Sequence, residues 1–445
     1  MKIEEKTMEN KVTFYEETNF KNTEIGEIPK DWEVVKLGEV LEEVKTKNKE
    51  GKSLKVYSVS NIHGFIESDE FFDRKVYSVD LKPYKVVMEN YFAYNPYRVN
   101  VGSIGLFTEK DAGLVSPAYV VFKIKNEQKL MPEFLYSNLK SPKYISEISR
   151  IAMSRGSVRR SLSFKDLGLM SIPLPPLEEQ KAIAYVLSTV QEAREKTEKV
   201  TEATKELKKS LMKHLFTYGP VSLEEASRIS LKETEIGEIP ADWEVVKLGE
   251  VALRMKAGGT PHTAVKEFWN GDIPFVLIED MTGQGVFLSK TKRMITQEGL
   301  RNSSAWLVPA NSLLVSMYAT IGETAINLIP VATNQAIIAI VPRENFDVLY
   351  GAYFIKYDSR RLQMQNIQST QKNVNRAIVE NFSIPLPPLS VQKRIAEILQ
   401  TVDEKIQAEE KKKQALDNLF NSMLHMLMSG KLRVKFQTFE EGASG

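Results

Sequence analysis

Ser171-Ile-Pro-Leu-Pro-Pro-Leu177 opens a charged stretch that contains no glycine and no proline as far as Leu215. The same seven residues return 212 positions later as Ser383-Ile-Pro-Leu-Pro-Pro-Leu389, again before a long charged stretch. A second phrase, Asp31-Trp-Glu-Val-Val-Lys-Leu-Gly-Glu-Val40, reappears as Asp242 to Val251. A fixed period of this kind indicates a duplicated structural unit. Each copy contains an opening phrase, a globular stretch, a proline-rich junction and a long charged segment.

The composition is that of a globular protein without cysteine chemistry. Of the 445 residues, 42% are hydrophobic and 27% are charged, and none is cysteine. This excludes disulfides, thiolate zinc sites, iron–sulfur clusters and a cysteine nucleophile. No apolar run reaches the length of a membrane span, and the charged start Met1-Lys-Ile-Glu-Glu-Lys6 lacks the apolar core of a signal peptide. We therefore expect a cytoplasmic protein.

The charge balance restricts how the chain can bind nucleic acid. Its net charge is +2, which is far from the strongly basic profile of a DNA-binding domain that acts alone. A nucleic-acid role would need local basic patches or a partner that shares the contact.

The globular stretches predict two β-rich domains of an α+β fold. Short β-branched runs such as Val56–Val59 and Val99–Val101 are separated by Gly, Pro, Asn and Asp, as in a compact sheet domain with many turns. Helical spacing appears at the end of each stretch, around Val348–Tyr357 in the second copy. The predicted segments are a tail at 1–20, a first domain at 21–175, a central long helix at 176–219, a linker with a second domain at 220–386, a distal long helix at 387–432 and a tail at 433–445.

The charged segments predict two helices with a heptad seam. Apolar or small residues recur in steps of three and four, as in a coiled coil. In the first helix the predicted seam is Ile183, Val186, Val190, Ala193, Thr197, Val200, Thr204, Leu207 and Leu211. In the second it is Ile395, Leu399, Val402, Ile406, Glu409, Lys413, Leu416, Phe420, Met423 and Leu427. Prolines before each helix exclude an upstream helical turn.

Two arrangements of these helices are open. Each helix could pack on its own domain, but a helix of about 38 residues is roughly 57 Å long and exceeds what one domain needs. In a chain with two related halves, antiparallel pairing of the helices is the better interpretation. It would hold one β-rich domain at each end, several tens of ångströms apart.

Polar loops near the junctions are the first candidates for nucleic-acid contact. The first copy has Arg155-Gly-Ser-Val-Arg-Arg-Ser161, and the second has Ser369-Thr-Gln-Lys-Asn373 at the matching place. Arg, Gln, Asn and Lys read base edges, and Ser and Lys suit phosphates. A solvated loop is the alternative for each. Two equivalent loops of different chemistry are suited to reading different sequences.

Further candidates lie at turns within the domains. Lys256-Ala-Gly-Gly-Thr-Pro-His262 is a glycine-rich turn that could bring main chain to a phosphate, although it lacks the Gly-Lys-Ser/Thr ending of a nucleotide loop. Thr333-Asn-Gln335 precedes a strand and suits base contact or turn capping equally. Ala93-Tyr-Asn-Pro-Tyr97 departs from the Asn/Asp-Pro-Pro-Tyr/Phe motif of adenine methyltransferases, because the second proline is missing.

No catalytic constellation stands out. The four histidines are scattered without metal-ligand spacing, and no Ser/His/Asp set or carboxylate pair is evident. The chain is predicted to be a non-enzyme without a cofactor or metal of its own.

Together these motifs resemble the specificity subunits of type I restriction-modification systems. The resemblance is carried by Ile172-Pro-Leu-Pro-Pro-Leu-Glu-Glu-Gln180 and Ile384-Pro-Leu-Pro-Pro-Leu-Ser-Val-Gln392, each opening a long helix, and by the repeated Gly26-Glu-Ile-Pro29 and Gly237-Glu-Ile-Pro240. It covers about residues 20–434. The first copy lacks a match to Gly258-Gly-Thr-Pro261, so contacts cannot be transferred between the domains.

The resemblance implies a DNA-reading subunit of a larger complex. Each domain would be a target recognition domain for one half of a bipartite duplex DNA site, and the helices would set the unread spacer. They would also dock two methyltransferase subunits that carry S-adenosylmethionine, and endonuclease subunits could then join. The DNA-binding residues expected on this basis are Arg155, Ser157, Arg159, Arg160, Asn95, Tyr97, Arg98, Gly259, Thr260, Asn334, Gln335, Thr370, Gln371, Lys372 and Asn373. The partner-binding residues expected are Gln180, Gln392 and Arg394.

Two other functions remain alternatives. One is a structural coiled-coil adaptor that assembles proteins without reading DNA. The other is a stand-alone adenine methyltransferase, which the missing cofactor loop and the altered Asn-Pro motif disfavour.

Overall fold

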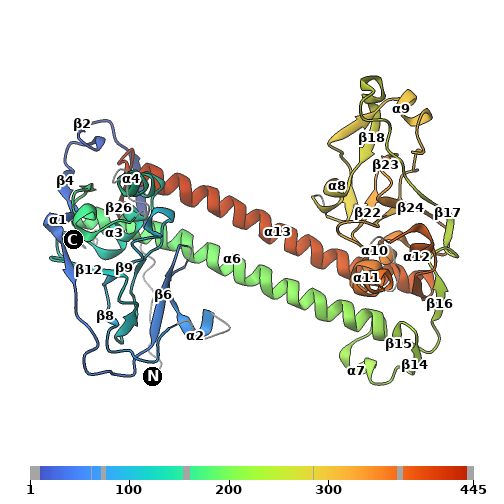
Figure 1. Cartoon of the computed structure of the whole chain (residues 1–445), viewed down its shortest axis with the longest axis horizontal. Coiled ribbons are helices and arrows are strands. Elements are labelled where there is room, and N and C mark those ends of the chain that lie inside the picture. Colours follow the sequence, from blue (N-terminus) through green and yellow to red (C-terminus); the bar gives the residue numbers. More distant parts are fainter. Residues whose placement is uncertain are drawn as a thin grey trace, which may run out of the picture. The chain divides into compact units, whose positions relative to one another are not determined.

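The computed structural model describes residues 11–61, 63–71, 77–153, 161–283, 285–367 and 374–437. Contacts between residues divide the chain into two units. The first unit comprises the described residues of Met1–Thr197 and Lys412–Gly445, and the second comprises those of Glu198–Lys411. Figure 1 labels the elements of both.

The first unit is built on short strands with small helices beside them. The strands are β1 (Val12–Glu16), β2 (Phe20–Thr23), β3 (Gly26–Pro29), β4 (Glu33–Lys36), β5 (Leu41–Val44), β6 (Val56–Ser60), β7 (Gly64–Glu67), β8 (Lys85–Val87), β9 (Phe92–Tyr94), β10 (Ile104–Leu106), β11 (Gly113–Val115), β12 (Val120–Ile124), β13 (Ser171–Leu174) and β26 (Leu432–Phe436). The helices are α1 (Leu37–Val40), α2 (Ser68–Phe71), α3 (Pro132–Leu139), α4 (Pro142–Met153) and α5 (Phe164–Leu167).

Two four-stranded sheets form the body of this unit, in the orders β10-β9-β12-β5 and β7-β6-β11-β8. Val99–Val101, predicted to be a strand, is a single 3-10 turn that ends at Gly102 with a φ of 82°. The left-handed conformation suits glycine and ends the run of extended backbone there.

The second unit has a larger sheet. Its strands are β14 (Leu231–Thr234), β15 (Gly237–Pro240), β16 (Glu244–Lys247), β17 (Ala252–Ala257), β18 (Trp269–Val276), β19 (Phe287–Leu288), β20 (Arg293–Ile295), β21 (Ser312–Ser316), β22 (Thr324–Asn327), β23 (Ala332–Thr333), β24 (Ile337–Pro342) and β25 (Ser383–Leu386). Its short helices are α7 (Leu223–Ala226), α8 (Ile278–Thr282), α9 (Gln297–Arg301), α10 (Val348–Tyr357), α11 (Ser359–Ile367) and α12 (Arg376–Glu380). The sheets run β17-β24-β21-β22-β19 and β20-β18-β23.

The two repeated sequence phrases are hydrogen-bonded to each other in both units. In the first unit β13 pairs antiparallel with β4, so that Ile172 lies opposite Val35. In the second unit β25 pairs with β16 in the same register, with Ile384 opposite Val246. The proline-rich junction is therefore a strand, and its pairing explains why both phrases recur together.

The two long helices are α6 (Leu177–Tyr218) and α13 (Leu389–Met428). Each begins in one unit and ends in the other, so each unit contains the start of one helix and the end of its counterpart. Within each unit the two helices lie side by side (Figure 1). They run antiparallel in the second unit, because Lys205 pairs with Glu410 and Lys208 with Asp403. Arg194 and Asp417 make the corresponding ion pair in the first unit.

The seam of α13 agrees with the prediction, and that of α6 agrees except at Val200 and Leu207. Val200 and Leu207 are exposed, whereas Thr201 and Met212 are buried. The buried face of α6 passes from Thr197 to Thr201 and on to Lys205, two steps of four in succession. Such a stutter rotates the buried face relative to a strict heptad.

Each unit has its own main core, and both long helices contribute to each. In the first unit Ile183 and Leu187 of α6 pack with Leu424 and Leu427 of α13. The second unit uses the opposite ends: Leu215 and Phe216 of α6 and Ile395 and Leu399 of α13 belong to its core, together with residues of the sheet strands. Within the described residues, no helix is long and apolar enough to cross a membrane.

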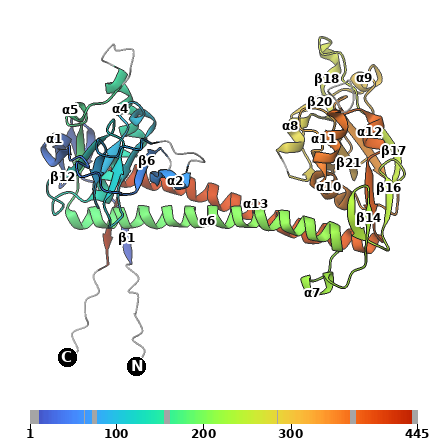
Figure 2. The same ribbon diagram turned by 60° about the horizontal axis from the view of Figure 1, so that its bottom comes forward.

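The predicted tails at 1–20 and 433–445 contain paired structure, which corrects the prediction. Strand β1 pairs antiparallel with β26, with Phe14 opposite Val434 (Figure 2). The two strands are more than 400 residues apart in sequence, so local patterning gave no sign of the pairing. This two-stranded ribbon joins the first and the last described strands of the chain within the first unit.

A partly buried ion cluster holds this ribbon in place. Arg433 is 5% exposed and donates to Glu179 at the start of α6, to Asp31 and to Glu17. Its Nη2 lies 2.7 Å from an oxygen of both Asp31 and Glu179. The Trp32 indole N–H donates to Glu179 at 3.0 Å. We call Arg433, Glu17, Asp31 and Glu179 the Arg433 cluster.

The cluster changes the acidity of two of its carboxyl groups. Hydrogen bonding to the Arg433 guanidinium lowers the pKa of Asp31. The pKa of Glu17 is also lowered, by the main-chain N–H of Asn19 and then by Arg433. Both groups therefore favour the charged form in the folded protein.

Candidate nucleic-acid interface

The glycine-rich turn of the second unit, at Gly258 and Gly259, allows two turns to pack closely against each other. A Cβ on Gly258 would lie 2.0 Å from the main-chain oxygen of Thr333, and one on Gly259 would lie 2.2 Å from the Ser304 hydroxyl. The Gly259 N–H donates to Thr333 at 2.9 Å, and Gly259 is buried. The Gly259 main chain, expected to contact a phosphate, packs closely against a second turn.

This packing brings together three of the polar side chains that the sequence selected. Thr260 and Gln335 are exposed, and the Thr260 hydroxyl donates to the Gln335 side-chain oxygen at 2.6 Å. Asn334 is half-buried, and its side-chain oxygen accepts from the Ala336 N–H at 3.1 Å. Asn334 thus caps the turn, while Thr260 orients the Gln335 amide at the surface.

The polar residues selected in the first unit, Asn95, Tyr97 and Arg98, lie in the turn between β9 and β10. The Asn95 side-chain oxygen accepts from the Tyr97 N–H at 3.0 Å, which fixes the turn. Tyr97 is 54% exposed and Arg98 is also exposed. The Leu162 N–H donates to the Pro96 oxygen at 3.1 Å, so the turn is tied to the residue that follows the arginine-rich loop.

The two junction loops lie outside the described residues. Arg155, Ser157, Arg159 and Arg160 fall in one of them, and Thr370, Gln371, Lys372 and Asn373 in the other. Their predicted roles in DNA contact remain predictions.

The glutamines predicted to bind a partner lie inside the two units, hydrogen-bonded to main-chain groups. Gln180 is fully buried, donates to Lys129 and Pro175 oxygens and accepts from the Met131 N–H at 2.9 Å. These bonds leave its amide no donor for another subunit. They fasten the start of α6 to the loop before α3.

Gln392 repeats this arrangement in the second unit. It is fully buried, donates to Asn345 and Pro387 oxygens, and accepts from the Asp347 N–H at 2.9 Å. Arg394 differs, because its side chain is 64% exposed and lies 3.5 Å from Glu397 on the same helix. Arg394 alone of these three presents a charged group at the surface.

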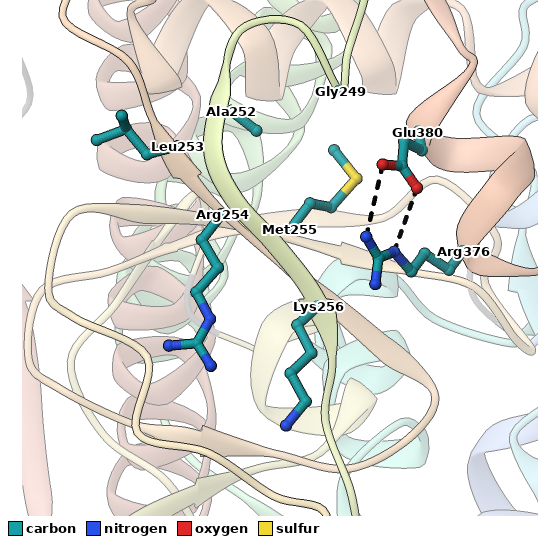
Figure 3. A pocket seen from close by; sticks show the side chains of 8 residues that line it. All are labelled: Gly249, Ala252, Leu253, Arg254, Met255, Lys256, Arg376 and Glu380. Atoms are coloured by element: carbon teal, nitrogen blue, oxygen red, sulfur yellow. Dashed lines mark hydrogen bonds and ion pairs between the residues drawn. The ribbon is translucent and has the colours of Figure 1, made fainter.

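Sequence reasoning missed a group of cations on β17. Arg254 and Lys256 lie beside a surface hollow of about 400 Å³, with Arg376 and Glu380 of α12 on its other side (Figure 3). We call Arg254, Lys256 and Arg376 with this space the cationic hollow. The available signal was the alternation of two cations around buried Met255, which places both on one face of a strand.

Among the described residues, no group of three or more histidine, aspartate or glutamate side chains is arranged to hold a metal ion. The polar groups gathered at the turns are amides, hydroxyls and guanidinium groups. Such groups bind bases and phosphates.

The family model of the type I restriction modification DNA specificity domain matches the chain twice, at residues 29–205 and 240–418. The chain belongs to this family. The two matches contain the two β-rich domains and most of the long helices, so the duplication seen in the sequence is a duplication of this domain.

Curated relatives match over almost the whole chain or over about half of it. It is 28% identical over 437 residues to the putative type I restriction enzyme MjaX specificity subunit of Methanocaldococcus jannaschii, covering 95% of this chain and 98% of that one. It is 29% identical over 240 residues to the EcoR124I/EcoR124II specificity subunit of Escherichia coli, covering 52% and 55%.

Solved structures share the fold. The S subunit of a type I restriction-modification system from M. genitalium aligns with a TM-score of 0.57 at 16% identity, over 89% of this chain and 96% of that one. A chain from a study of complex assembly in the type I R-M system aligns with a TM-score of 0.53 at 20% identity, over 91% and 99%.

These matches confirm the predicted family and fold class. The chain is a type I restriction-modification specificity subunit with two target-recognition domains. Specificity subunits are the non-catalytic components of such systems, so the prediction of a non-enzyme is also confirmed.

Proposed function

We propose that each target-recognition domain reads one half of a bipartite site in duplex DNA. The observation that carries this proposal is the contrast between a shared frame and different surface turns. The β13–β4 and β25–β16 pairs are alike in register, whereas Tyr97 and Arg98 stand at the surface of one domain and Gln335 at that of the other. Equal frames with unequal polar turns suit the reading of two different half-sites.

In the second domain we assign base reading to Gln335 and positioning to Thr260. A glutamine amide can donate and accept at an adenine edge in the major groove. The Thr260 hydroxyl occupies one lone pair of the Gln335 oxygen at 2.6 Å, which leaves the second lone pair and the NH₂ group for a base. Asn334 supports the turn.

In the first domain we assign DNA contact to Tyr97 and Arg98, supported by Asn95. An arginine can make bidentate contact with guanine, and an exposed tyrosine can pack on sugar or base. The junction loops with Arg155, Ser157, Arg159 and Arg160, and with Thr370, Gln371, Lys372 and Asn373, extend this proposal in the two domains.

The long helices would set the unread spacer between the half-sites and dock two methyltransferase subunits. The support is that α6 and α13 each connect the two domains without a glycine or proline inside, as a stiff connection requires. The methyltransferase subunits would carry S-adenosylmethionine and methylate adenine, and endonuclease subunits would join the complex. Arg394, exposed near the start of α13, is the candidate partner contact.

Methylation mapping tests this function. The chain is expressed with a type I methyltransferase subunit of the same system in a host that lacks the system, and N6-methyladenine is mapped in the host DNA. Methylation at a split motif that depends on the chain is the expected result. Methylation at the same sites without the chain would reject a DNA-reading role. The coiled-coil adaptor would then be the remaining alternative function.

The role of the helices has its own test. Four residues inserted at matching places in both α6 and α13 lengthen each helix by about 6 Å. The mapped motif should keep both half-sites and gain spacer length. An unchanged spacer in an active, assembled complex would contradict the proposed spacing role.

The base-reading residues are tested by the same mapping. Gln335→Ala should relax or abolish one half-site only, while the other half-site and complex assembly persist. Arg98→Ala should affect the opposite half-site, which makes the two variants controls for each other. Loss of both half-sites in either variant would contradict independent reading.

A further inference from the structure

The cationic hollow of the second unit joins the edge strand β17 to the short helix α12. Arg254 and Lys256 leave the same face of β17, and Met255 between them is buried in the core (Figure 3). Because alternate residues of a strand face the same side, the two cations stand next to each other on a rigid element.

The charges of the hollow are only partly neutralised. Arg376 forms an ion pair with Glu380 at 3.2 Å. Among the described residues, Arg254 and Lys256 have no carboxylate partner within ion-pair distance. The hollow therefore carries two uncompensated positive charges in a chain whose net charge is only +2.

Arg254 is held in place by an aromatic ring. Its guanidinium group lies 4.3 Å from the ring centroid of Trp306, which is buried. Stacking of this kind fixes the plane of the guanidinium and leaves its N–H groups free at the edge. A fixed, solvent-facing guanidinium is suited to a phosphate oxygen.

The first unit shows that the frame does not require a cation at the place of Arg254 or of Arg376. The Gly249 N–H donates to the Glu380 oxygen and the Gly38 N–H to the Gly168 oxygen, each at 2.9 Å, so the two places are equivalent. By this equivalence Glu43 stands where Arg254 does, and it pairs with Lys45 at 3.0 Å.

The opposite wall differs in the same way. Phe164 takes the place of Arg376, and its ring packs 6.0 Å from that of Phe122. The first unit thus folds with a neutral pair and an aromatic ring where the second has exposed cations. Lys45 keeps a lysine at the place of Lys256, but there it is paired with Glu43, so a structural need is absent for Arg254 and for an unpaired charge at Lys256.

We propose that the cationic hollow binds the phosphodiester backbone of duplex DNA beside the half-site read by the second domain. This inference rests on the proposed DNA-reading function. It adds a DNA contact in the second target-recognition domain only. Strand β17 leads directly into the turn that presents Thr260. Three residues separate Lys256 from Thr260, so their Cα atoms lie at most about 13 Å apart. Phosphate contacts on β17 would fix the position from which Gln335 reads a base.

The test uses the assembled complex with its methyltransferase subunits and a duplex that contains the mapped motif. A second duplex carries the same bases in scrambled order. Dissociation constants are measured for both across a series of salt concentrations. R254Q/K256Q should weaken binding by about tenfold per lost cation near 0.1 M salt, equally for both duplexes. The slope of log K against log salt should fall by about 0.9 for each lost contact, while the methylated motif stays the same.

Three variants control this result. R254K/K256R keeps both charges and should retain most of the affinity and the salt slope. K45Q, at the matching place of the first unit, should change neither. E380Q removes the carboxylate that neutralises Arg376 and should strengthen binding several-fold, a gain that misfolding cannot produce.

Distinct outcomes overturn the inference. Unchanged affinity and salt slope in an intact R254Q/K256Q complex would reject the phosphate contact, although wild-type reading of the motif would keep the proposed function. An altered motif in that variant would show that the hollow reads bases instead. A wild-type complex that binds both duplexes equally would reject the proposed function, and this inference with it.

Discussion

The first and second units share a frame but are completed by different means. In both, the two repeated sequence phrases form the same strand pair, and a buried glutamine fastens the start of a long helix. The first unit is closed by β1, β26 and the Arg433 cluster. In the second unit the chain continues from α6 into Ser222, which caps α7. The two units thus share the strand pair and the buried glutamine at the start of each long helix, whereas the elements that complete each unit differ.

Removing the charge of Arg433 should give the largest difference in stability between the two units. R433M leaves buried Glu179, half-buried Glu17 and exposed Asp31 without their cation, so we expect the first unit to lose about 3–5 kcal/mol of stability, mostly through Glu179. Urea unfolding followed by hydrogen exchange in peptides of each unit measures the loss. Peptides of the second unit serve as the internal control. Equal loss in both units would contradict independent closure.

The same variant has a pH signature. The folded-state pKa values of Asp31 and Glu17 are lowered, so their stabilisation is present above their unfolded values near 4 and is lost as pH falls through the folded values. Wild-type stability should therefore fall below about pH 4, and R433M should show a shallower fall. Parallel acid unfolding curves for the two proteins would argue against this contribution.

The glycines that end the long helices give the next largest contrast. Gly430 and Gly219 have φ values of 67° and 85°, but a Cβ on Gly430 would lie 2.4 Å from the Pro29 ring, whereas one on Gly219 would meet only Trp243 at 3.3 Å. G219A should cost about 1–2 kcal/mol through backbone strain, and G430A about 2–5 kcal/mol, because overlap is added. Urea unfolding of both variants checks the order, which an equal cost would contradict.

The buried glutamines sharpen the likeness of the two units. Q180L and Q392L each leave main-chain groups without their partners, and each should cost about 2 kcal/mol in its own unit. R394A is the matched control, since an exposed side chain on the same kind of helix should change stability by less than about 0.5 kcal/mol. Co-purification with the methyltransferase subunit tests the partner contact, and R394A should weaken it. Clearly unequal losses of stability in Q180L and Q392L would contradict the equivalence of the two glutamines.

The smallest expected effect concerns the ion pairs between α6 and α13. Lys208–Asp403 in the second unit and Arg194–Asp417 in the first are half-buried, each with a separation of 2.5 Å. Double-mutant cycles with alanine should give about 0.5–1 kcal/mol of coupling for each pair. A coupling near zero in one unit alone would show that the helices pair differently in the two halves.

Repetition made much of this fold predictable from the sequence. The phrases around Asp31 and Ser171 marked the two domains, and the steps of three and four between Ile395 and Leu427 predicted the buried face of α13. Local spacing was enough in these cases because neighbouring turns of one helix share a face. It failed on α6, where two consecutive steps of four expose Val200 and Leu207.

Long-range contacts account for the other errors. The pairing of Phe14 with Val434 joins distant segments, and the burial of Gln180 depends on a loop near Met131. For the site, the sequence selected Thr260 and Gln335, and the structure places them in hydrogen-bond contact. It missed the cationic hollow because Arg376 and Lys256, 120 positions apart, line one hollow only in the tertiary fold.

The pairing of β1 with β26 also sets an order of maturation during synthesis. The second unit needs no residue beyond Lys411, whereas the first needs β26, which leaves the ribosome later. Domains of a nascent chain usually mature from the N-terminus onward. Here the half that is translated first is completed last, and β1 must wait with its edge unpaired until almost the whole chain has been made.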